Sequence, residues 1–424
     1  MKVLIVNTSE LTGGAAVAAN RLMKALKNNG VQAKMLVRDK QTDDISVVGI
    51  GKGWRSRLAF LWERWCIFTR LHFSKTHLFE LDIANAGIDI TRLPEFQEAD
   101  VIHLHWINQG FLSLSGIQKM IDSGKPIVWT MHDIWPATAI CHYARGCRKF
   151  SSNCSKCPLL PQSNMCDFAN RIWKRKQRVF HQHSVSFVAC SKWLAEEARK
   201  SMLLKEQVVT NIPNPIDTHV FQPQDQTMSR KEVGLPTDGR KIILFVSQRV
   251  TDERKGMEYF VKAVSKMVEQ HPEMVKTTAI AILGGHSEVL ENHLELSVFP
   301  LGYINDANRI VKVYSSSDMF VIPSLEDNLP NTIMEAMSCG VPCVGFEVGG
   351  IPEMIDHQKN GYVARFRDVD DLSAGMYWVL NEASREELRA QALRKVLREY
   401  SQQRVALKYT EVYNKAIAEK NYKL

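Results

Sequence analysis

The sequence has no stretch of apolar residues long enough to span a bilayer, which excludes membrane-crossing helices. Its first residues, Met1 to Asn7, form too short an apolar run for a secretory signal peptide, so we expect a cytoplasmic protein. Cysteine is sparse, with nine in 424 residues, and in that compartment this number argues against a disulfide framework. No repeat of fixed period and no low-complexity segment occurs, so a solenoid is not expected.

What the sequence does have is a regular alternation of short apolar runs with helical patterns. This alternation is typical of βαβ units, in which helices cover both faces of a parallel sheet. A chain of 424 residues is too long for one ordinary core, and the alternation restarts after residue 240. We therefore expect two doubly wound α/β domains, separated near residues 213–240. The expected strands are residues 2–8, 33–38, 100–105, 126–132, 184–191 and 207–213, then 241–248, 277–284, 298–303, 319–323 and 342–347.

The positive charge is concentrated in one segment. Residues 142–178 contain nine Lys or Arg against one acid, Asp167, and this excess equals the net charge of +8 of the whole chain. Eight of the nine tryptophans also lie before residue 200. The first half is therefore basic and aromatic, which indicates an anionic partner or surface there.

The most informative segment is residues 323–340, which read PSLEDNLPNTIMEAMSCG. An apolar strand ends at Pro323, a helix is expected to begin near Pro330, and two acids, Asp327 and Glu335, stand eight positions apart. In an open parallel sheet, ligands bind at the carboxyl ends of the strands, and a helix start offers free N–H groups and a positive dipole end. We expect this loop to hold an anionic, hydroxyl-rich ligand.

The first expected strand is followed by Gly13-Gly14. This turn has no G-x-G-x-x-G motif and no P-loop lysine, which disfavours a hydride-transfer dinucleotide enzyme. Two glycines at a helix start still let a ligand approach the backbone, and the alternative is a tight turn with a good helix start. We favour ligand approach.

Segments spread along both expected domains match one family. They are Gly13-Gly14, residues 101–106 (VIHLHW), 130–133 (TMHD) and 212–217 (IPNPID), Arg249 with Lys255-Gly256, residues 323–340, and residues 349–353 (GGIPE). The chain resembles the retaining glycosyltransferases of family 4 (glycosyl transferases group 1), which use nucleotide-sugar donors. The resemblance implies the GT-B fold, with two Rossmann-like domains facing across a cleft. Residues 1–214 would form the acceptor-side domain with a cysteine-rich insert at 138–166, residues 215–400 the donor-binding domain, and residues 401–424 a helix returning to the first domain.

The resemblance implies that the second domain binds the donor. Arg249 and Lys255 match the pair that binds the diphosphate, whose negative charge grows in the transition state; the alternative is a charged surface pair beside a helix. The family's Glu-x7-Glu pair becomes Asp327 and Glu335 here, with Glu326 one residue away. Either Asp327 or Glu326 would hold the sugar hydroxyls. Glu335 would accept from the ribose hydroxyls, or else be an acid that stabilises a helix start.

The turn between these acids would also contact the donor. Asn328, Leu329 and Asn331 shape it, and their backbone N–H groups would face the sugar or phosphate. Gly13 and Gly14 are assigned to the same ligand.

No convincing metal-binding carboxylate motif occurs in the sequence. Asp368-Val369-Asp370 has the D-x-D form that other glycosyltransferases use for a divalent metal, but Asp368 precedes an expected helix and is better explained as its cap. We expect a metal-independent reaction that requires no cofactor.

His132 is the catalytic candidate of the first domain. The resemblance places it against the donor sugar, where an imidazole can donate to a hydroxyl without acting as a base; the alternative is a satisfied histidine at a strand end. His103 and His105 alternate along an expected strand, and we expect them to point to opposite faces. His105 and Trp106, at the strand end, are the better acceptor-side candidates.

Four cysteines, Cys141, Cys147, Cys154 and Cys157, gather in the 138–166 insert. The Cys154-x-x-Cys157 knuckle suits tetrahedral zinc, with His142 and Cys166 as spare ligands, but the wider spacing is not a standard zinc signature. Zinc would hold together a basic segment with little core of its own. Structural zinc and free or air-oxidised thiols both stay open.

Residues 54–73 hold six aromatics and four arginines against one acid, Glu63. At helical spacing, one face gathers Leu and Trp side chains flanked by arginine, which suits an anionic membrane interface. The alternative, a helix whose apolar face packs on the first sheet, is slightly preferred from the sequence alone.

We therefore expect a retaining glycosyltransferase that moves a sugar from a nucleotide diphosphate sugar to a saccharide or polyprenyl-linked saccharide, in cell-surface polysaccharide synthesis. It would be cytoplasmic, and peripheral at the inner face of the plasma membrane if the tryptophan helix binds lipid. Nucleic acid is not an expected partner, because clustered base-stacking motifs are absent. A GT-B sugar-nucleotide epimerase and a non-catalytic sugar- or polyanion-binding protein are the alternatives. The motifs do not distinguish uridine from guanosine donors.

Overall fold

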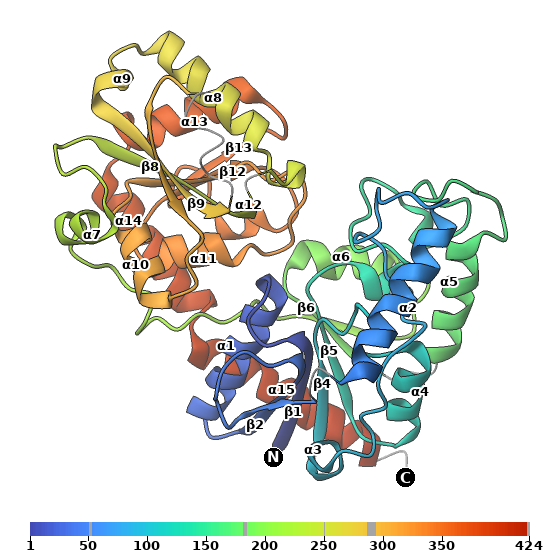
Figure 1. Ribbon diagram of the computed structural model, residues 1–424. Helices are drawn as coiled ribbons and strands as arrows, with labels where there is room; N and C mark the ends of the chain where they lie inside the picture. The colour runs from blue at the N-terminus through green and yellow to red at the C-terminus, as the bar shows by residue number, and fades with distance from the viewer. Residues whose placement is uncertain (51–52, 181–184, 250, 286–293, 422–424) are drawn as a thin grey trace. The chain divides into compact units, whose positions relative to one another are not determined.

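A computed structural model describes residues 1–50, 53–180, 185–249, 251–285 and 294–421. The chain divides into two compact units: unit 1 is Met1–Pro215 with Gln402–Leu424, and unit 2 is Ile216–Ser401. Each unit has a parallel sheet with helices on both faces (Figure 1). The two doubly wound α/β sheets expected from the sequence are therefore confirmed.

The unit 1 sheet has the strand order β3-β2-β1-β4-β5-β6-β7 among the described residues. Successive strands add outward from β1 on one side and from β4 on the other, so the winding reverses between β1 and β4. The strands are β1 (Lys2–Ser9), β2 (Gln32–Asp39), β3 (Val47–Gly49), β4 (Val101–Leu104), β5 (Ile127–Met131), β6 (Ser186–Ala189) and β7 (Val208–Asn211).

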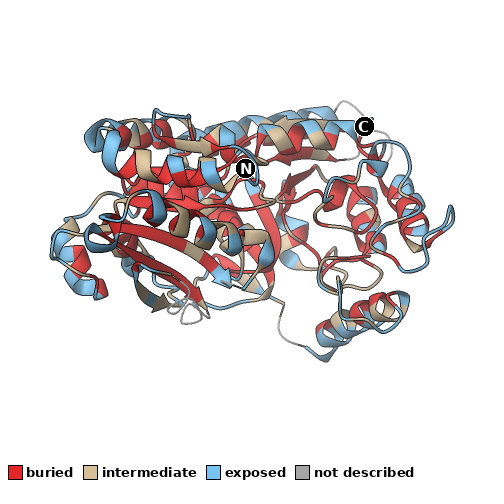
Figure 2. Ribbon diagram, turned by 90° about the horizontal axis from the view of Figure 1, so that it is seen from above, coloured by how far each residue is buried: buried red, intermediate tan, exposed pale blue. Residues whose placement is uncertain are grey.

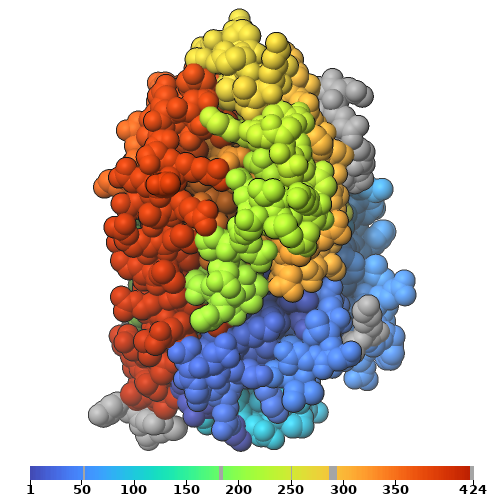
Figure 3. Space-filling model, turned by 90° about the vertical axis from the view of Figure 1, so that its left-hand side faces the viewer, coloured from blue at the N-terminus to red at the C-terminus, as the bar shows by residue number. Residues whose placement is uncertain are grey.

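Two groups of helices cover the unit 1 sheet. The helices are α1 (Gly14–Asn28), α2 (Trp54–Arg70), α3 (Pro94–Glu98), α4 (Leu114–Asp122), α5 (Phe168–Val179), α6 (Lys192–Lys200) and α15 (Gln402–Asn421). One face carries α1 and α15, which share a core with alternate residues of β1 such as Ile5. Figure 3 shows the red C-terminal atoms beside the blue N-terminal ones. The opposite face of β1, with Leu4 and Val6, packs with α2 to α6.

The unit 2 sheet has the strand order β10-β9-β8-β11-β12-β13, and its winding reverses between β8 and β11. The strands are β8 (Lys241–Arg249), β9 (Thr278–Gly285), β10 (Ser297–Gly302), β11 (Met319–Ile322), β12 (Cys343–Phe346) and β13 (Gly361–Ala364). The helices are α7 (Gln226–Val233), α8 (Met257–Gln270), α9 (Met274–Thr277), α10 (Ala307–Ser315), α11 (Asn331–Ser338), α12 (Ile351–Met354), α13 (Val369–Tyr377) and α14 (Arg385–Glu399). Most strand residues of both sheets are buried, as sheets covered on both faces require (Figure 2).

The structure differs from the sequence prediction in short or terminal elements. β3 and β13 were not expected, because three or four residues carry too little periodicity to be recognised. The glycine-free stretch 385–420 is two helices, which end and restart around Tyr400 and Ser401, where Ser401 pairs with Ile216. Residue 184 of an expected strand and residues 422–424 of the expected last helix lie outside the described residues. No helix in the described part of the chain is both long and apolar enough to cross a membrane.

Candidate active site

The donor-side candidates of unit 2 meet at one edge of its sheet. Arg249 is the last residue of β8, the 323–330 loop follows β11, and Gly349-Gly350 follows β12. These three strands are neighbours, and their carboxyl ends lie where the winding of the sheet reverses. Open α/β sheets bind ligands at this position.

Lys255 and Asp327 form an ion pair at this edge. The Lys255 Nζ lies 2.6 Å from Asp327 Oδ2, and the Ser324 hydroxyl donates to the same oxygen at 3.3 Å. Burial alone would raise the pKa of Asp327, but the charges of Lys255 and Arg254 outweigh it and hold the pKa below its usual value. The carboxylate is therefore ionised, and the lysine is held beside the loop.

The sequence left open whether Asp327 or Glu326 is the first acid of the Glu-x7-Glu pattern, and the two side chains have different surroundings in the structure. Asp327 turns its carboxylate onto Lys255, as described above. Glu326 is half-buried, and its main-chain carbonyl accepts a hydrogen bond of 3.0 Å from Arg254 Nη1. Its neighbour Asp327 is thus the acid whose carboxylate contacts the expected diphosphate-binding lysine.

Glu335 is buried in the second turn of α11. Its Oε2 accepts a hydrogen bond of 3.0 Å from the Tyr314 hydroxyl of α10. Burial and the nearby carboxylate raise the pKa of Tyr314 well above its usual value, so the phenol stays a donor. Sequence reasoning missed Tyr314, because a tyrosine on the apolar face of an amphipathic helix has no pattern that separates it from ordinary core.

Two glycines fix the backbone around the loop. Gly256 has φ +70°, and a Cβ there would lie 1.8 Å from the Pro323 carbonyl oxygen. Gly349 has φ +57°, and a Cβ there would lie 1.7 Å from the Asp327 carbonyl oxygen. The close neighbour of Gly349 is therefore the 323–330 loop, which a side chain at this position would displace.

The remaining donor-side candidates lie along the same turn. Asn328 and Leu329 are buried, and Asn331 is the first residue of α11, directly after Pro330. Arg249 is exposed. The turn therefore leads directly into α11, and the expectation that its backbone N–H groups face a ligand stays a prediction.

The candidate residues of unit 1 follow strands β1, β4 and β5, and the winding of this sheet reverses between β1 and β4. Gly13 precedes α1 in a left-handed conformation (φ +92°), and Trp106 follows β4. The Trp106 N–H donates to Asn7 Oδ1 at 2.9 Å, which joins the ends of β1 and β4. His132 follows β5, the next strand.

His105 and His132 contact each other through their rings. His105 Nδ1 lies 2.9 Å from His132 Nε2, and His132 Nδ1 lies 3.5 Å from the Cys190 thiol. Burial lowers the pKa of His132 to about 4 and that of His105 well below its usual value. Both imidazoles are therefore neutral near pH 7, which suits hydrogen bonding to a hydroxyl rather than charge stabilisation.

The expectation that His103 and His105 point to opposite faces is wrong. Their ring centroids are 4.3 Å apart, because residues two apart on a strand share a face. His103 is fully buried beneath α15, where its two ring nitrogens meet the Thr130 and Tyr413 hydroxyls at 2.7 Å each. His103 is therefore part of the core.

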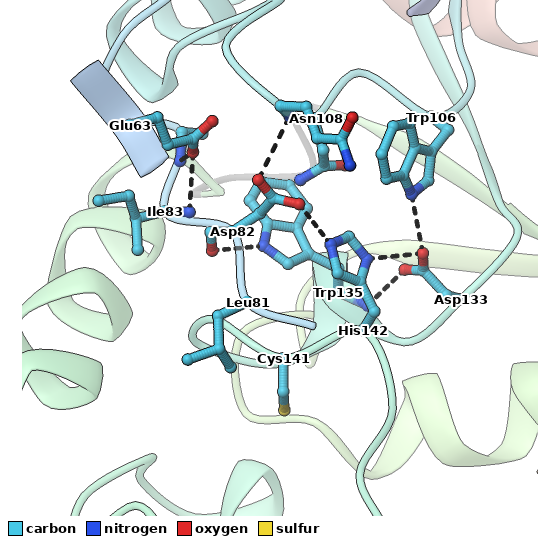
Figure 4. Close-up of polar contacts among 12 residues, drawn as sticks. Glu63, Leu81, Asp82, Ile83, Trp106, Asn108, Asp133, Trp135, Cys141 and His142 are labelled. Atoms are coloured by element: carbon cyan, nitrogen blue, oxygen red, sulfur yellow. Dashed lines mark hydrogen bonds and ion pairs between the residues drawn. The ribbon is translucent and has the colours of Figure 1, made fainter. Parts of the chain in front are cut away.

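A buried charged network includes Asp133, the residue that follows His132 in the chain (Figure 4). His142 Nδ1 lies 2.7 Å from Asp133 Oδ2, and His142 Nε2 lies 2.6 Å from Asp82 Oδ2. The Trp106 indole donates to the same Asp133 oxygen at 3.0 Å. Burial would lower the pKa of His142, but the two carboxylates raise it to about 10, so the ring is an imidazolium. Sequence reasoning assigned neither Asp82 nor this role of His142, since nothing in the spacing of residues 82, 133 and 142 indicates contact.

Replacing His142 by asparagine should lower the free energy of unfolding by about 3 kcal/mol, because two buried carboxylates lose their shared cation. The folded-state pKa of about 10 is above the ordinary 6.5, so the stabilisation is complete below pH 6.5 and is lost as the pH rises through 10. Urea unfolding of the unaltered protein and of His142→Asn between pH 6 and 10 should therefore show that the difference in their free energies of unfolding becomes smaller as the pH rises. A difference that does not change with pH would contradict the conclusion that His142 is an imidazolium in the folded protein.

The four cysteines of the insert line one cavity of about 160 Å³, together with Arg145 and Lys149. Burial raises the pKa of Cys141 and Cys154 to about 12. In the described residues no three His, Cys, Asp or Glu side chains are arranged to hold a metal ion as they stand. Zinc binding would require the thiols to turn toward one another, and structural zinc stays a prediction.

Metal analysis of protein purified without chelator tests the zinc prediction. We expect about one zinc per chain, which Cys154→Ser/Cys157→Ser should lose together with thermal stability. Cys166→Ser is the matched control, because Cys166 is exposed and does not line the cavity. If the protein contains no zinc and a chelator does not change its melting temperature, the four cysteines are free thiols.

The D-x-D sequence has a structural role, as expected. Asp368 is the N-cap of α13, where its side chain accepts from the Asp371 N–H at 3.0 Å, and Arg365 lies 3.0 Å from its other oxygen. Asp370 pairs with Lys266.

Two family models cover most of the chain. Residues 12–220 match "Glycosyltransferase Family 4", and residues 240–382 match "Glycosyl transferases group 1". An uncharacterised glycosyltransferase of Methanocaldococcus jannaschii is 30% identical over 241 residues, which are 55% of this chain and 61% of that protein. The chain spans about half the length of the curated relatives it matches.

Solved structures match over the full length. A sucrose-phosphate synthase of Thermosynechococcus elongatus has a TM-score of 0.68 at 16% identity, with 99% of each chain covered. HepE of Anabaena, solved in complex with UDP, has a TM-score of 0.63 at 15% identity, with 98% of this chain and 100% of that chain covered. These likenesses confirm the expected GT-B fold. The chain belongs to the family 4-like, group 1 glycosyltransferases.

Proposed function

We propose that this protein is a retaining, metal-independent glycosyltransferase that uses a nucleotide diphosphate sugar. The observation that carries the proposal is the carboxyl edge of the unit 2 sheet, where Lys255 pairs with Asp327 and where α11, the helix that carries Glu335, follows β11, in a chain of this family. The acceptor is a saccharide or a polyprenyl-linked saccharide. The reaction serves cell-surface polysaccharide synthesis on the cytoplasmic side of the membrane.

The donor site works by exchange of ion-pair partners. Without donor, Lys255 is neutralised by Asp327 at 2.6 Å. A diphosphate would draw the ammonium away, with Arg249 as a second cation, and the freed Asp327 carboxylate would accept from sugar hydroxyls. Glu335, held by Tyr314, would accept from the ribose hydroxyls. Charge on the departing diphosphate is thereby stabilised by cations and by the α11 start.

Unit 1 supplies the acceptor side of the proposal. His132 is neutral and half-buried, so its ring can exchange hydrogen bonds with a sugar hydroxyl. The Asp82–His142–Asp133 network fixes the Trp106 indole beside it. Metal independence is supported by the occupied Asp368 side chain, which caps a helix.

A panel of nucleotide sugars tests the proposal, first by thermal shift and then by donor turnover with and without saccharide acceptors. UDP-sugars are measured first, because HepE was solved with UDP. Proton NMR of the product should show the donor's anomeric configuration, with EDTA having no effect. Conversion of the donor to an isomer without acceptor would favour the epimerase. Binding of polyanions with no donor turnover would favour the non-catalytic alternative.

A further inference from the structure

Helix α2 presents its apolar face outward. Five large apolar residues on one stripe are half or more exposed: Trp54 (70%), Leu58 (52%), Leu61 (50%), Trp62 (56%) and Trp65 (53%). The residues that α2 buries are Ser56, Glu63, Arg64 and Ile67. This is the reverse of an ordinary surface helix, whose apolar stripe faces the core. The helix does pack on the core of unit 1, through Ile67 near its end, but the apolar stripe at residues 54–65 faces away from that core.

The buried charges hold α2 in this orientation. Glu63 Oε1 accepts from the Ile83 and Ala84 N–H groups at 3.0 and 2.6 Å. Arg64 donates to the Leu78 and Leu81 carbonyls at 2.6 and 3.0 Å and forms an ion pair with Asp82. Because main-chain groups hold Glu63 Oε1 and Arg64 Nη1, and Asp82 holds Arg64 Nη2, turning the helix over would break all of these contacts. The outward tryptophans are thus a fixed property of the fold.

The surface around the stripe is basic. Within α2 the only acid is the buried Glu63, whereas Arg55, Arg57 and Arg70 are exposed. Arg70 lies over the Phe168 ring at 5.4 Å, which places the end of α2 against the start of α5. The exposed residues of α5 include four further cations, Arg171, Lys174, Arg175 and Arg178. Aromatic and cationic side chains therefore occupy neighbouring helices (Figure 1).

We propose that the outer face of α2, together with the basic face of α5, is a docking surface for an anionic lipid bilayer. Tryptophan rings and leucines enter the interfacial region, and arginines meet lipid phosphates. A second copy of this chain fits less well, because a two-fold contact through this face would bring like-charged arginines together. The inference goes beyond the proposed reaction and is tested without donor or acceptor.

The test is co-sedimentation of the full-length protein with phosphatidylcholine vesicles, with and without phosphatidylglycerol. We expect salt-sensitive binding to the anionic vesicles and little to the neutral ones. Leu58→Gln/Leu61→Gln should weaken anionic binding on the order of tenfold or more. The matched control is Leu397→Gln/Leu407→Gln, which replaces two leucines of similar exposure on other helices (57% and 51%) and should bind like the unaltered protein.

Two outcomes would overturn the docking surface. The first is a vesicle result: either the protein does not bind anionic vesicles at low salt, or the α2 double variant binds them as strongly as the control double variant does. The other is concentration-dependent dimerisation in sedimentation velocity that the α2 variant abolishes, with no vesicle binding, which would assign the face to a second copy. Because all four leucines are already exposed, both variants should keep the unaltered thermal unfolding curve.

Discussion

Lys255→Ala should lower kcat/KM for sugar transfer by about 10²–10³-fold, the usual cost of removing one preorganised group that stabilises transition-state charge. The ammonium lies 2.6 Å from Asp327 at the carboxyl ends of β8 and β11. The loss should fall mainly on kcat, since charge on the diphosphate grows as it departs. Steady-state kinetics with the donor found in the panel gives this measurement.

Two variants separate this effect from general damage. Lys255→Arg keeps the charge and should retain part of the activity. Lys262→Ala removes an exposed lysine of α8 that pairs with Glu258 in the same unit, and should leave kinetics unchanged. Full activity of the Lys255→Ala variant would contradict the assignment of Lys255 to the donor site.

Glu335→Ala should reduce transfer by a similar factor while the protein stays folded, since in the proposed function this buried carboxylate accepts hydrogen bonds from the ribose hydroxyls. Here the loss should appear largely as a higher KM for the donor, because the ribose does not take part in bond breaking. Nucleotide affinity, measured by calorimetry, should fall in parallel.

Tyr314→Phe is the informative companion to this variant. It leaves the carboxylate in place and removes the 3.0 Å hydrogen bond that orients it, so donor affinity should fall by about tenfold or less. If Tyr314→Phe weakens donor binding as much as Glu335→Ala, the carboxylate acts on the fold rather than on the ribose.

Much of the architecture could be predicted because the relevant signals are local. The apolar runs of β8 and β11 and the cap at Asp368 depend on residues adjacent in sequence, and each is found where expected. The family pattern assigned Lys255 and Asp327 to one ligand but did not predict their ion pair, since 72 positions separate them.

The contacts that were missed depend on tertiary structure. Asp82 reaches His142 across 60 positions, and Tyr314 reaches Glu335 from another helix. The same limit explains α2, because the periodicity of residues 54–73 defines an apolar stripe without saying which side of the helix the core occupies. The orientation of α2 is set by Glu63 and Arg64, whose partners are main-chain groups and Asp82.

The position of α15 has a consequence for the order of synthesis. Its Tyr409 and Tyr413 complete the core above β4 and β5 and bond the Thr130 and His103 side chains, although the 186 residues of unit 2 come between. A ribosome therefore releases all of unit 2 before unit 1 can close over its last helix. Until then the surface that buries His103 stays open to water, and a chain that stops at residue 401 would carry a complete unit 2 and a unit 1 sheet that lacks its last helix.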